Sequence, residues 1–279
     1  MKSFQDKVAA ITGAGSGIGR ALALGLARAG CELALSDVDE ATLQQTAALV
    51  GGAVKVTTAR VDVSSRDALY AWAAQAARDH GRVNLIFNNA GVAVGATAEG
   101  ITDEDFRWIM GINFWGVVHG TRAFLPHLRA SGDGHVINIS SLFGLIAVPG
   151  QSAYNASKFA VRGFTESLRQ ELDLTRACVS ATCVHPGGIQ TNIARASRVS
   201  PSLRDLGAPD PAAVTRDFEK QFRTTPGAAA AQILRGVQRD ARRVLVGADA
   251  HLLDVLQRVL GSAYQRLAVA AARRYLRPP

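Results

Sequence analysis

The stretch Thr12-Gly13-Ala14-Gly15-Ser16-Gly17-Ile18-Gly19 decides the fold, because it separates a short apolar run, Lys7 to Thr12, from a segment of helical spacing, Gly17 to Ala29. Glycines between a strand and a helix allow a tight turn and bring backbone N–H groups close to a phosphate, whose charge the helix N-terminus favours. The stretch therefore predicts a phosphate-binding turn made by Gly13, Gly15, Ser16, Gly17, Ile18 and Gly19.

Outward from this turn, apolar runs typical of buried strands alternate with segments of helical spacing. The expected strands are Lys7 to Thr12, Glu32 to Ser36, Lys55 to Val61, Asn84 to Asn88, His135 to Ser140, Val179 to His185 and Arg243 to Val246. The expected helices are Gly17 to Ala29, Glu40 to Leu49, Arg66 to His80, Asp103 to Arg129, Ser152 to Leu174 and Ala228 to Arg239. Strands that are apolar throughout are buried on both faces, so the pattern predicts an α/β fold with a doubly wound, parallel, Rossmann-type sheet of about seven strands and helices on both faces.

The expected organisation is a single catalytic domain over residues 1–250 and a C-terminal helical extension over 251–279. Within the domain, Arg195 to Thr225 is rich in proline and irregular, which is typical of a substrate loop or lid. Residues 220–279 hold 11 Lys and Arg against 3 Asp and Glu, which accounts for the whole net charge of +8.

The extension after His251 has the pattern of a basic amphipathic helix. We expect it to pack on the fold or on a partner subunit with its arginines in solvent. A peripheral membrane contact through 251–279 is the less favoured alternative. Nucleic acid is not an expected partner, because no aromatic residues interleave with the basic ones and no known nucleic-acid motif accompanies them.

Asp37 follows the second expected strand, about twenty residues after the glycine turn, where an acidic side chain binds the adenosine ribose of a dinucleotide. Its charge would repel a 2′-phosphate. No lysine or arginine lies in the turn from Gly13 to Gly19, and none follows Asp37 closely. These residues favour NAD over NADP. The alternative interpretation of Asp37 is a loop or capping residue before the helix that begins at Glu40.

Tyr154 and Lys158 are four residues apart in a helical segment and therefore share one helix face. An ammonium group near the phenol is expected to favour its anion, lower its pKa from about 10 and make Tyr154 a proton donor or acceptor. Ser141, thirteen residues earlier at a strand end, is expected to point its hydroxyl into the same space. Strand alternation would point Ser140 the other way.

With these motifs in order, the chain resembles the short-chain dehydrogenases/reductases over roughly residues 5 to 250. The resemblance rests on the glycine turn, Asp62-Val63, Asn88-Asn89-Ala90-Gly91, Asn113, Ser141, Tyr154-x-x-x-Lys158, and Pro186-Gly187 with Thr191. It implies Tyr154 as general acid/base, Lys158 as ligand of the nicotinamide ribose, Ser141 as holder of the substrate oxygen, and Asn113 in a water-linked proton relay. These four are the expected catalytic residues.

The resemblance also implies a cofactor-binding set. Asp62 with Val63 is expected at the adenine, and Asn89, Ala90 and Gly91 on the ribose side of the cofactor. The segment Pro186, Gly187, Ile189 and Thr191 is expected at the nicotinamide carboxamide. Tyr154 and Lys158 belong to this set too.

The expected substrate pocket is largely apolar and has no fixed charge close to Ser141. Its candidate residues are Val92, Val94, Leu142, Phe143, Val148, Gln151, Gly188 and the segment Arg195 to Leu206. These favour an uncharged, fairly hydrophobic secondary alcohol or ketone. A sensor or scaffold that binds NAD without turnover is the alternative, which the presence of all four catalytic residues disfavours. No metal is expected, because no His, Cys and Asp cluster has ligand spacing.

Other side chains are expected to be structural. His185 is interpreted as structural rather than as a base, and Trp108, Phe114, Trp115 and Phe124 as core or subunit interface. The three cysteines form no C-x-x-C pair and are expected as small buried residues in a reducing compartment.

The start of the chain lacks the apolar region of a signal peptide, and no run of 18 apolar residues follows, so a cytoplasmic protein is expected. The helices Asp103 to Arg129 and Ser152 to Leu174 carry apolar residues on more than one face. In the family that the chain resembles, the corresponding helices pair across a two-fold axis. A homodimer or homotetramer is therefore expected.

Overall fold

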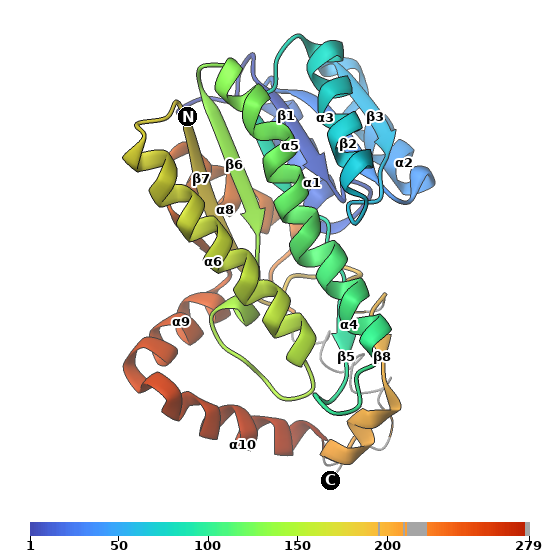
Figure 1. Ribbon diagram of the computed structural model, residues 1–279, viewed down its shortest axis with the longest axis vertical. Coiled ribbons are helices and arrows are strands. Elements are labelled where there is room, and N and C mark those ends of the chain that lie inside the picture. The colour runs from blue at the N-terminus through green and yellow to red at the C-terminus, as the bar shows by residue number, and fades with distance from the viewer. Residues whose placement is uncertain (195, 209, 211–221, 277–279) are drawn as a thin grey trace.

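A parallel sheet of seven strands forms the centre of the computed structural model, which describes residues 1–194, 196–208, 210 and 222–276, the last three by backbone alone (Figure 1). Its strands lie in the order β3-β2-β1-β4-β6-β7-β9. They are β1 (Val8–Thr12), β2 (Glu32–Asp37), β3 (Val56–Arg60), β4 (Leu85–Asn88), β6 (Gly134–Ile139), β7 (Val179–Pro186) and β9 (Arg243–Val246). The direction of winding reverses between β1 and β4, which is where α/β sheets bind ligands.

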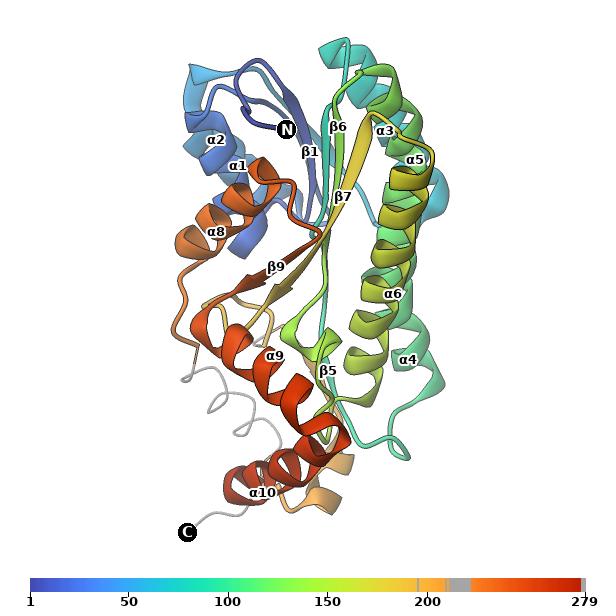
Figure 2. The same ribbon diagram turned by 90° about the vertical axis from the view of Figure 1, so that its left-hand side faces the viewer.

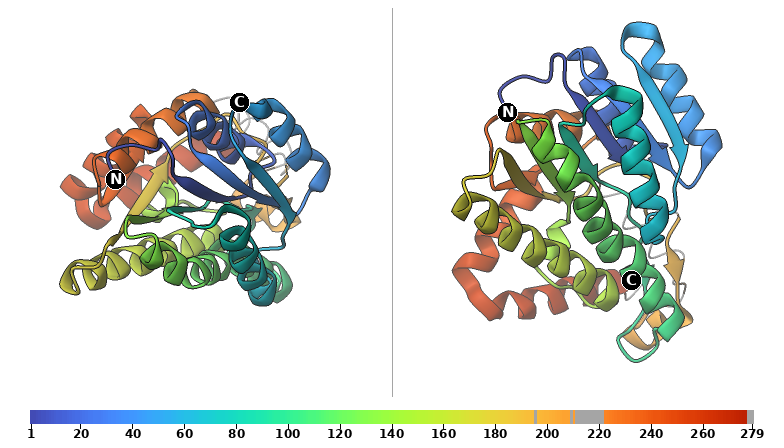
Figure 3. Two further views of the ribbon diagram at one scale, coloured as in Figure 1. Left: turned by 90° about the horizontal axis from the view of Figure 1, so that it is seen from above. Right: turned by 45° about the horizontal axis from the view of Figure 1, so that its top comes forward.

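Two layers of helices cover the sheet (Figures 2 and 3). One layer holds α1 (Gly17–Arg28), α2 (Glu40–Val50) and α8 (Pro226–Gln238), and the other α3 (Arg66–His80), α5 (Gly116–Ala130) and α6 (Ser152–Leu174). Side chains alternate between the layers: Leu33 and Leu35 of β2 pack in the first core, whereas Ala34 packs in the second. Burial on both faces explains why the strands are apolar throughout.

The expected doubly wound parallel sheet is confirmed, and each strand bound differs from the expected one by at most one residue. The expected helix from Asp103 to Arg129 differs more. It consists of α4 (Asp103–Met110), a π-helical turn (Gly111–Trp115) and α5. Such turns insert one residue into the helical repeat and are frequent at functional sites. Asn113 lies in this turn and is fully buried.

The C-terminal extension is two helices instead of the expected single one, and its first helix begins before His251. α9 (Ala248–Leu260) and α10 (Tyr264–Leu276) are separated at Gly261, which has the left-handed φ of +54°. They lie beyond the carboxyl ends of the strands (Figure 1).

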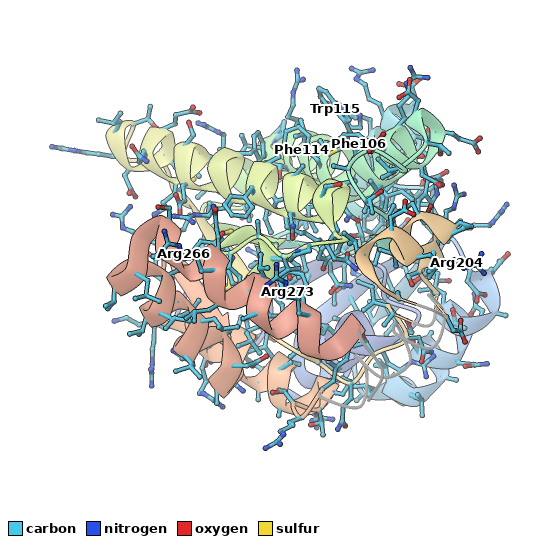
Figure 4. All side chains as sticks on the ribbon, turned by 90° about the horizontal axis from the view of Figure 1, so that it is seen from below. Phe106, Phe114, Trp115, Arg204, Arg266 and Arg273 are labelled. Carbon is cyan, nitrogen blue, oxygen red and sulfur yellow. The ribbon has the colours of Figure 1, made fainter. Side chains whose placement is uncertain are left out.

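One face of α9 packs on the fold through Ala250 and the nearly buried Asp254, while Leu252, Val255 and Val259 are exposed. On α10, Arg266 and Arg273 are exposed, and Figure 4 shows both on this helix. The extension is therefore anchored by its first helix, and Arg266 and Arg273 of its second helix are exposed to solvent.

The segment Arg195 to Thr225 is more ordered than its sequence suggests, where it is described. β8 (Arg198–Val199) pairs in parallel with β5 (Val94–Gly95), and a 3-10 helix (Pro201–Leu206) follows. Residues 195, 209 and 211–221 of the expected lid lie outside the described residues.

Of the three cysteines, Cys31 and Cys183 are buried as expected, but Cys178 is exposed, so the expectation is wrong for that residue. Cys178 directly precedes β7, which begins at Val179, and therefore lies in the exposed connection before the buried strand. Within the described part of the chain, no helix combines the length and the apolar character needed to cross a lipid bilayer.

The two cores make a simple prediction about stability. Leu26→Ala should lower the free energy of unfolding by about 2–5 kcal/mol, because Leu26 of α1 is fully buried and its loss leaves a cavity. Leu174→Ala, at a side chain that is 84% exposed, is the matched control and should change it by less than about 0.5 kcal/mol. Urea unfolding of both variants measures this, and equal losses would contradict the assignment of the core.

Candidate active site

The glycine turn between β1 and α1 has the shape of an anion-binding turn. Gly13 and Gly17 have φ of +64° and +52°, which side-chain-bearing residues rarely adopt. A Cβ on Gly19 would lie 2.1 Å from the carbonyl oxygen of Gly13. Ser16 is the N-cap of α1, but its side chain makes no capping hydrogen bond, and the first turn holds no acidic residue. The N-terminus of α1 therefore suits a pyrophosphate.

Hydrogen bonds tie this turn to the end of β4. The Thr12 hydroxyl accepts from the N–H groups of Asn89, at 2.9 Å, and Ala90, at 3.0 Å. The Asn89 amide donates to the carbonyl oxygens of Thr12, at 2.9 Å, and Gly13, at 3.1 Å. Asn89 is expected on the ribose side of the cofactor, but its side-chain NH2 group donates to the glycine turn and holds it in place.

Asp37 ends β2 directly beside the turn. Its Oδ2 accepts from the N–H of Gly15 at 2.8 Å, and its Oδ1 accepts from Asp39 at 3.0 Å. Asp62, expected at the adenine, accepts from both the N–H and the hydroxyl of Ser64 at 2.9 and 2.7 Å. The adjacent Val63 is buried against Gly116.

Two arginines outside the glycine turn also lie near this end of the site. Arg20, one residue past the turn, donates to the carbonyl oxygens of Gly15 and Thr42. Arg60 is the register partner of Asp37 in β3, is exposed, and donates to the carbonyl oxygen of Val38 at 3.2 Å. Strand pairing, which one sequence does not reveal, brings Arg60 there.

Ser141 and Tyr154 come together at the carboxyl end of β6. Ser141 caps a 3-10 turn (Leu142–Gly144), where its hydroxyl accepts from the N–H of Phe143 at 3.1 Å, and it lies beside the phenol of Tyr154 near the start of α6. Ser140 points the other way, as expected, and donates to the carbonyl oxygen of Lys158 at 2.8 Å. The two serines therefore have different roles. Ser141 faces the phenol, whereas Ser140 binds the backbone of α6.

The expected direction of the pKa shift at Tyr154 is wrong. Burial raises the pKa of the phenol, which the hydrogen bond from Ser141 opposes. The charge of Lys158, whose Nζ lies 5.7 Å from the centre of the Tyr154 ring and donates to the carbonyl oxygen of Ile139 at 3.2 Å, does not offset this effect of burial. Burial also lowers the pKa of Lys158 to about 8. Near neutral pH the phenol is therefore protonated and the amine mostly charged.

Asn113 joins three segments of the site. Its Oδ1 accepts from the N–H of Val92 at 2.8 Å, and its Nδ2 donates to the Val92 carbonyl at 2.9 Å and to the Ser157 hydroxyl at 3.1 Å. A Cβ on Gly91 would lie 3.3 Å from both Asn113 Oδ1 and Lys158 Nζ. Asn113, Gly91 and Lys158 are thus neighbours, and a side chain at Gly91 would crowd both polar groups.

The segment after β7 returns to the glycine turn. The Gly187 N–H donates to Val246 at 2.9 Å, and the Gly188 N–H donates to Asp249 Oδ2 at 2.6 Å. A Cβ on Gly17 would lie 3.1 Å from the methyl group of Thr191. Pro186, Gly187, Ile189 and Thr191, expected at the nicotinamide, therefore lead from the end of β7 back to the glycine turn.

The expected pocket residues divide into two apolar clusters beside Tyr154. Val92, Val94 and Tyr154 belong to the first cluster, and Phe143 of the second approaches the Tyr154 ring edge-on, with the ring centres 6.2 Å apart. The first cluster comprises Val94, Ala96, Ile109 and Ala153, with Val92, Ile101, Trp108 and Tyr154 against it. The second comprises Leu142, Leu145 and Ile146, with Phe143, Val148, Leu245, Leu253 and Tyr264 against it.

Two expected pocket residues lie outside these clusters. Gln151 pairs with Ala96 in an isolated bridge, and Gly188 lies against Phe222. Conversely, the sequence did not reveal that Ile109, Leu253 and Tyr264 belong beside the site. The apolar periodicity of their helices was visible, but nothing in it indicated which element they would contact.

His185 has the structural role that its position suggested. Its Nδ1 hydrogen-bonds the carbonyl oxygen of Ser141 at 2.9 Å, and burial lowers its pKa to about 4. The ring is therefore neutral and donates to that carbonyl, which holds the backbone of Ser141. Among the described side chains, no group of three His, Cys, Asp or Glu residues is placed to hold a metal ion.

Solved structures of known proteins share this fold. A short-chain dehydrogenase/reductase from Burkholderia phymatum in complex with NAD matches with a TM-score of 0.82 and 33% identity, over 100% of this chain and 98% of that one. A short-chain dehydrogenase from Mycobacterium paratuberculosis bound to NAD matches with a TM-score of 0.75 and 26% identity, over 88% and 97%.

Sequence comparison gives the same family. "Putative oxidoreductase SadH" of Mycobacterium tuberculosis is 49% identical over 277 residues, which are 99% of this chain and 98% of that protein. The family model described as short chain dehydrogenase matches residues 7–201. With the glycine turn and the Ser141, Tyr154 and Lys158 group already placed, the chain belongs to the short-chain dehydrogenase/reductase family of oxidoreductases.

Proposed function

We propose that the protein is an NAD-dependent oxidoreductase that interconverts an uncharged, fairly hydrophobic secondary alcohol and its ketone. The observation that carries this proposal is the position of Ser141 beside the phenol of Tyr154, between two apolar clusters. NAD, when bound, supplies or accepts hydride at its nicotinamide ring.

In the reducing direction, the protonated phenol of Tyr154 gives its proton to the substrate oxygen. The raised pKa keeps this proton in place until charge develops on that oxygen. The Ser141 hydroxyl donates a hydrogen bond to the same oxygen, and His185 keeps the Ser141 backbone in position. In the oxidising direction, each proton transfer is reversed.

Lys158 compensates the charge left on Tyr154 after proton transfer. Its ammonium group is buried and lies 5.7 Å from the centre of the phenol ring. The resemblance to the family implies that the nicotinamide ribose would lie beside the same ammonium group. Lys158 thus serves both proton transfer and cofactor binding in this proposal.

The preference for NAD follows from Asp37. Its carboxylate lies against the N–H of Gly15, and a 2′-phosphate placed beside it would meet a negative charge. Arg60 lies one strand away and is an exposed cation that could attract such a phosphate. We propose that repulsion by Asp37 outweighs attraction by Arg60, because Asp37 is bound directly to the turn.

Assembly into a homodimer or homotetramer is part of the proposal. Phe106, Trp115 and Phe159 are 37%, 50% and 39% exposed on α4, the π-helical turn and α6. Figure 4 shows Phe106, Phe114 and Trp115 on the same side of the molecule, and the ring centres of Phe114 and Trp115 are 5.5 Å apart. Exposed aromatic residues gathered in this way are typical of protein interfaces, and we propose a second copy as the partner.

The first prediction concerns turnover. Tyr154→Phe should lower kcat by about 10²–10⁴-fold, because it removes the proton donor. The dissociation constant of NADH, measured by fluorescence, should change by less than about threefold, since the ring and its packing remain. Tyr70→Phe on α3, whose ring lies under Arg66, is the matched control. Normal turnover by the Tyr154 variant would overturn the mechanism, whereas wild-type binding of NADH without turnover of any alcohol or ketone would favour a sensor.

The second prediction concerns cofactor choice. The wild-type protein should have a higher kcat/KM with NAD(H) than with NADP(H). Asp37→Asn should narrow the difference, because it removes the charge but keeps an oxygen for the Gly15 N–H. Arg60→Ala, added to that variant, should widen the difference again. A tenfold preference of the wild-type protein for NADPH would show that the assignment of Asp37 is wrong.

The third prediction concerns assembly. Trp115→Ser should lower the mass measured by light scattering at micromolar concentration, because it removes the largest exposed aromatic side chain of the proposed interface. Leu174→Ser, at the exposed end of α6, is the control and should leave the mass unchanged. An unchanged mass for Trp115→Ser, or a monomeric wild-type protein, would place the contact elsewhere or exclude it.

A further inference from the structure

The C-terminal extension contacts the apolar cluster that follows Ser141. Leu253 of α9 and Tyr264 at the start of α10 are half-buried and pack against the cluster of Leu142, Leu145 and Ile146. Phe143 and Val148, two of the expected substrate-pocket residues, pack against the same cluster. Two side chains from the end of the chain are therefore linked, through this cluster and Phe143, to the ring of Tyr154.

A hydrogen bond fixes the position of the Tyr264 ring. Its hydroxyl accepts from the N–H of Ala147 at 2.9 Å, in the segment between Ser141 and α6. The same segment carries Phe143, whose ring meets Tyr154 edge-on. Tyr264 is thus bound directly to the segment that positions both Phe143 and Val148.

Ion pairs hold α9 against the catalytic helix. The nearly buried Asp254 pairs with Arg243 of β9 at 3.5 Å and with Arg258 at 2.9 Å. Arg243 in turn pairs with Glu166 of α6 at 2.6 Å. Asp249, at the start of α9, accepts from the N–H of Gly188. Since both carboxylates of α9 bind inward, Leu253 has a defined place relative to Tyr154.

From these contacts we propose that Leu253 and Tyr264 are specificity-determining residues, which limit the size of the substituent on one side of the reacting carbon. This inference rests on the proposed function. A leucine and the face of a tyrosine favour an apolar, branched or ring-bearing substituent. Their truncation to alanine leaves room for a larger one. Neither side chain takes part in proton transfer, so the effect falls on substrate choice.

The test is a series of methyl ketones whose second substituent grows from ethyl through cyclohexyl to naphthyl. Leu253→Ala and Tyr264→Ala in the full-length protein should shift the ratio of kcat/KM, naphthyl over ethyl, at least about tenfold in favour of the larger ketone. Tyr264→Phe retains the ring and loses the hydrogen bond to Ala147, so it should stay close to the wild-type ratio. Leu252→Ala, at the exposed neighbour of Leu253, is the matched control and should not change it.

Binding gives a second measure of the same preference. The dissociation constants of the naphthyl and ethyl ketones for the complex of the protein with NADH are compared as a ratio in each variant. Equal losses for all ketones, with unchanged ratios in both measurements, would make Leu253 and Tyr264 merely structural and overturn the inference. The dissociation constant of NADH and the Tm of each variant separate this result from misfolding. If the wild-type protein reduces none of the ketones, the proposed function fails, while the binding ratios still decide the role of these two residues.

Discussion

All strands of the central sheet run in one direction, and the rest of the structure depends on this constraint. In a parallel sheet, the residues that follow the strands gather at one edge. Thr12 ends β1, Asn89 follows β4, Ser141 follows β6 and Pro186 ends β7. Residues far apart in the sequence therefore meet at the edge where α9 and α10 also lie, and burial of the sheet between two helical layers holds them there.

The fold was predictable because parallel strands buried on both faces leave a strong local pattern, short apolar runs between helical segments. The two misjudged helices break for different reasons. The π-helical turn at Asn113 coincides with hydrogen bonds to Val92 and Ser157, distant in the chain. The break at Gly261 follows a single glycine, which sequence patterns often place inside a helix as well.

The candidate site was predictable where one motif holds its parts together, as in the glycine turn and the spacing of Tyr154 and Lys158. The protonation state of Tyr154 was not predictable from the sequence. Spacing on a helix reveals which groups are near one another but not how deeply they are buried. Desolvation here exceeds the influence of Lys158 on the phenol. The position of Arg60 could not be predicted for a similar reason, because only the register between β2 and β3 brings it beside Asp37.

The hydrogen-bonded ladder of the sheet ends at Val246, and α9 and α10 follow it. Insertions, deletions or substitutions after this residue change side-chain packing near Tyr154 without removing a strand. If Leu253 and Tyr264 face the substrate, then descendants of one ancestral chain can diverge in the ketones they accept by altering their last thirty or so residues. The glycine turn and the Tyr154–Lys158 pair can meanwhile pass unchanged from one descendant to the next.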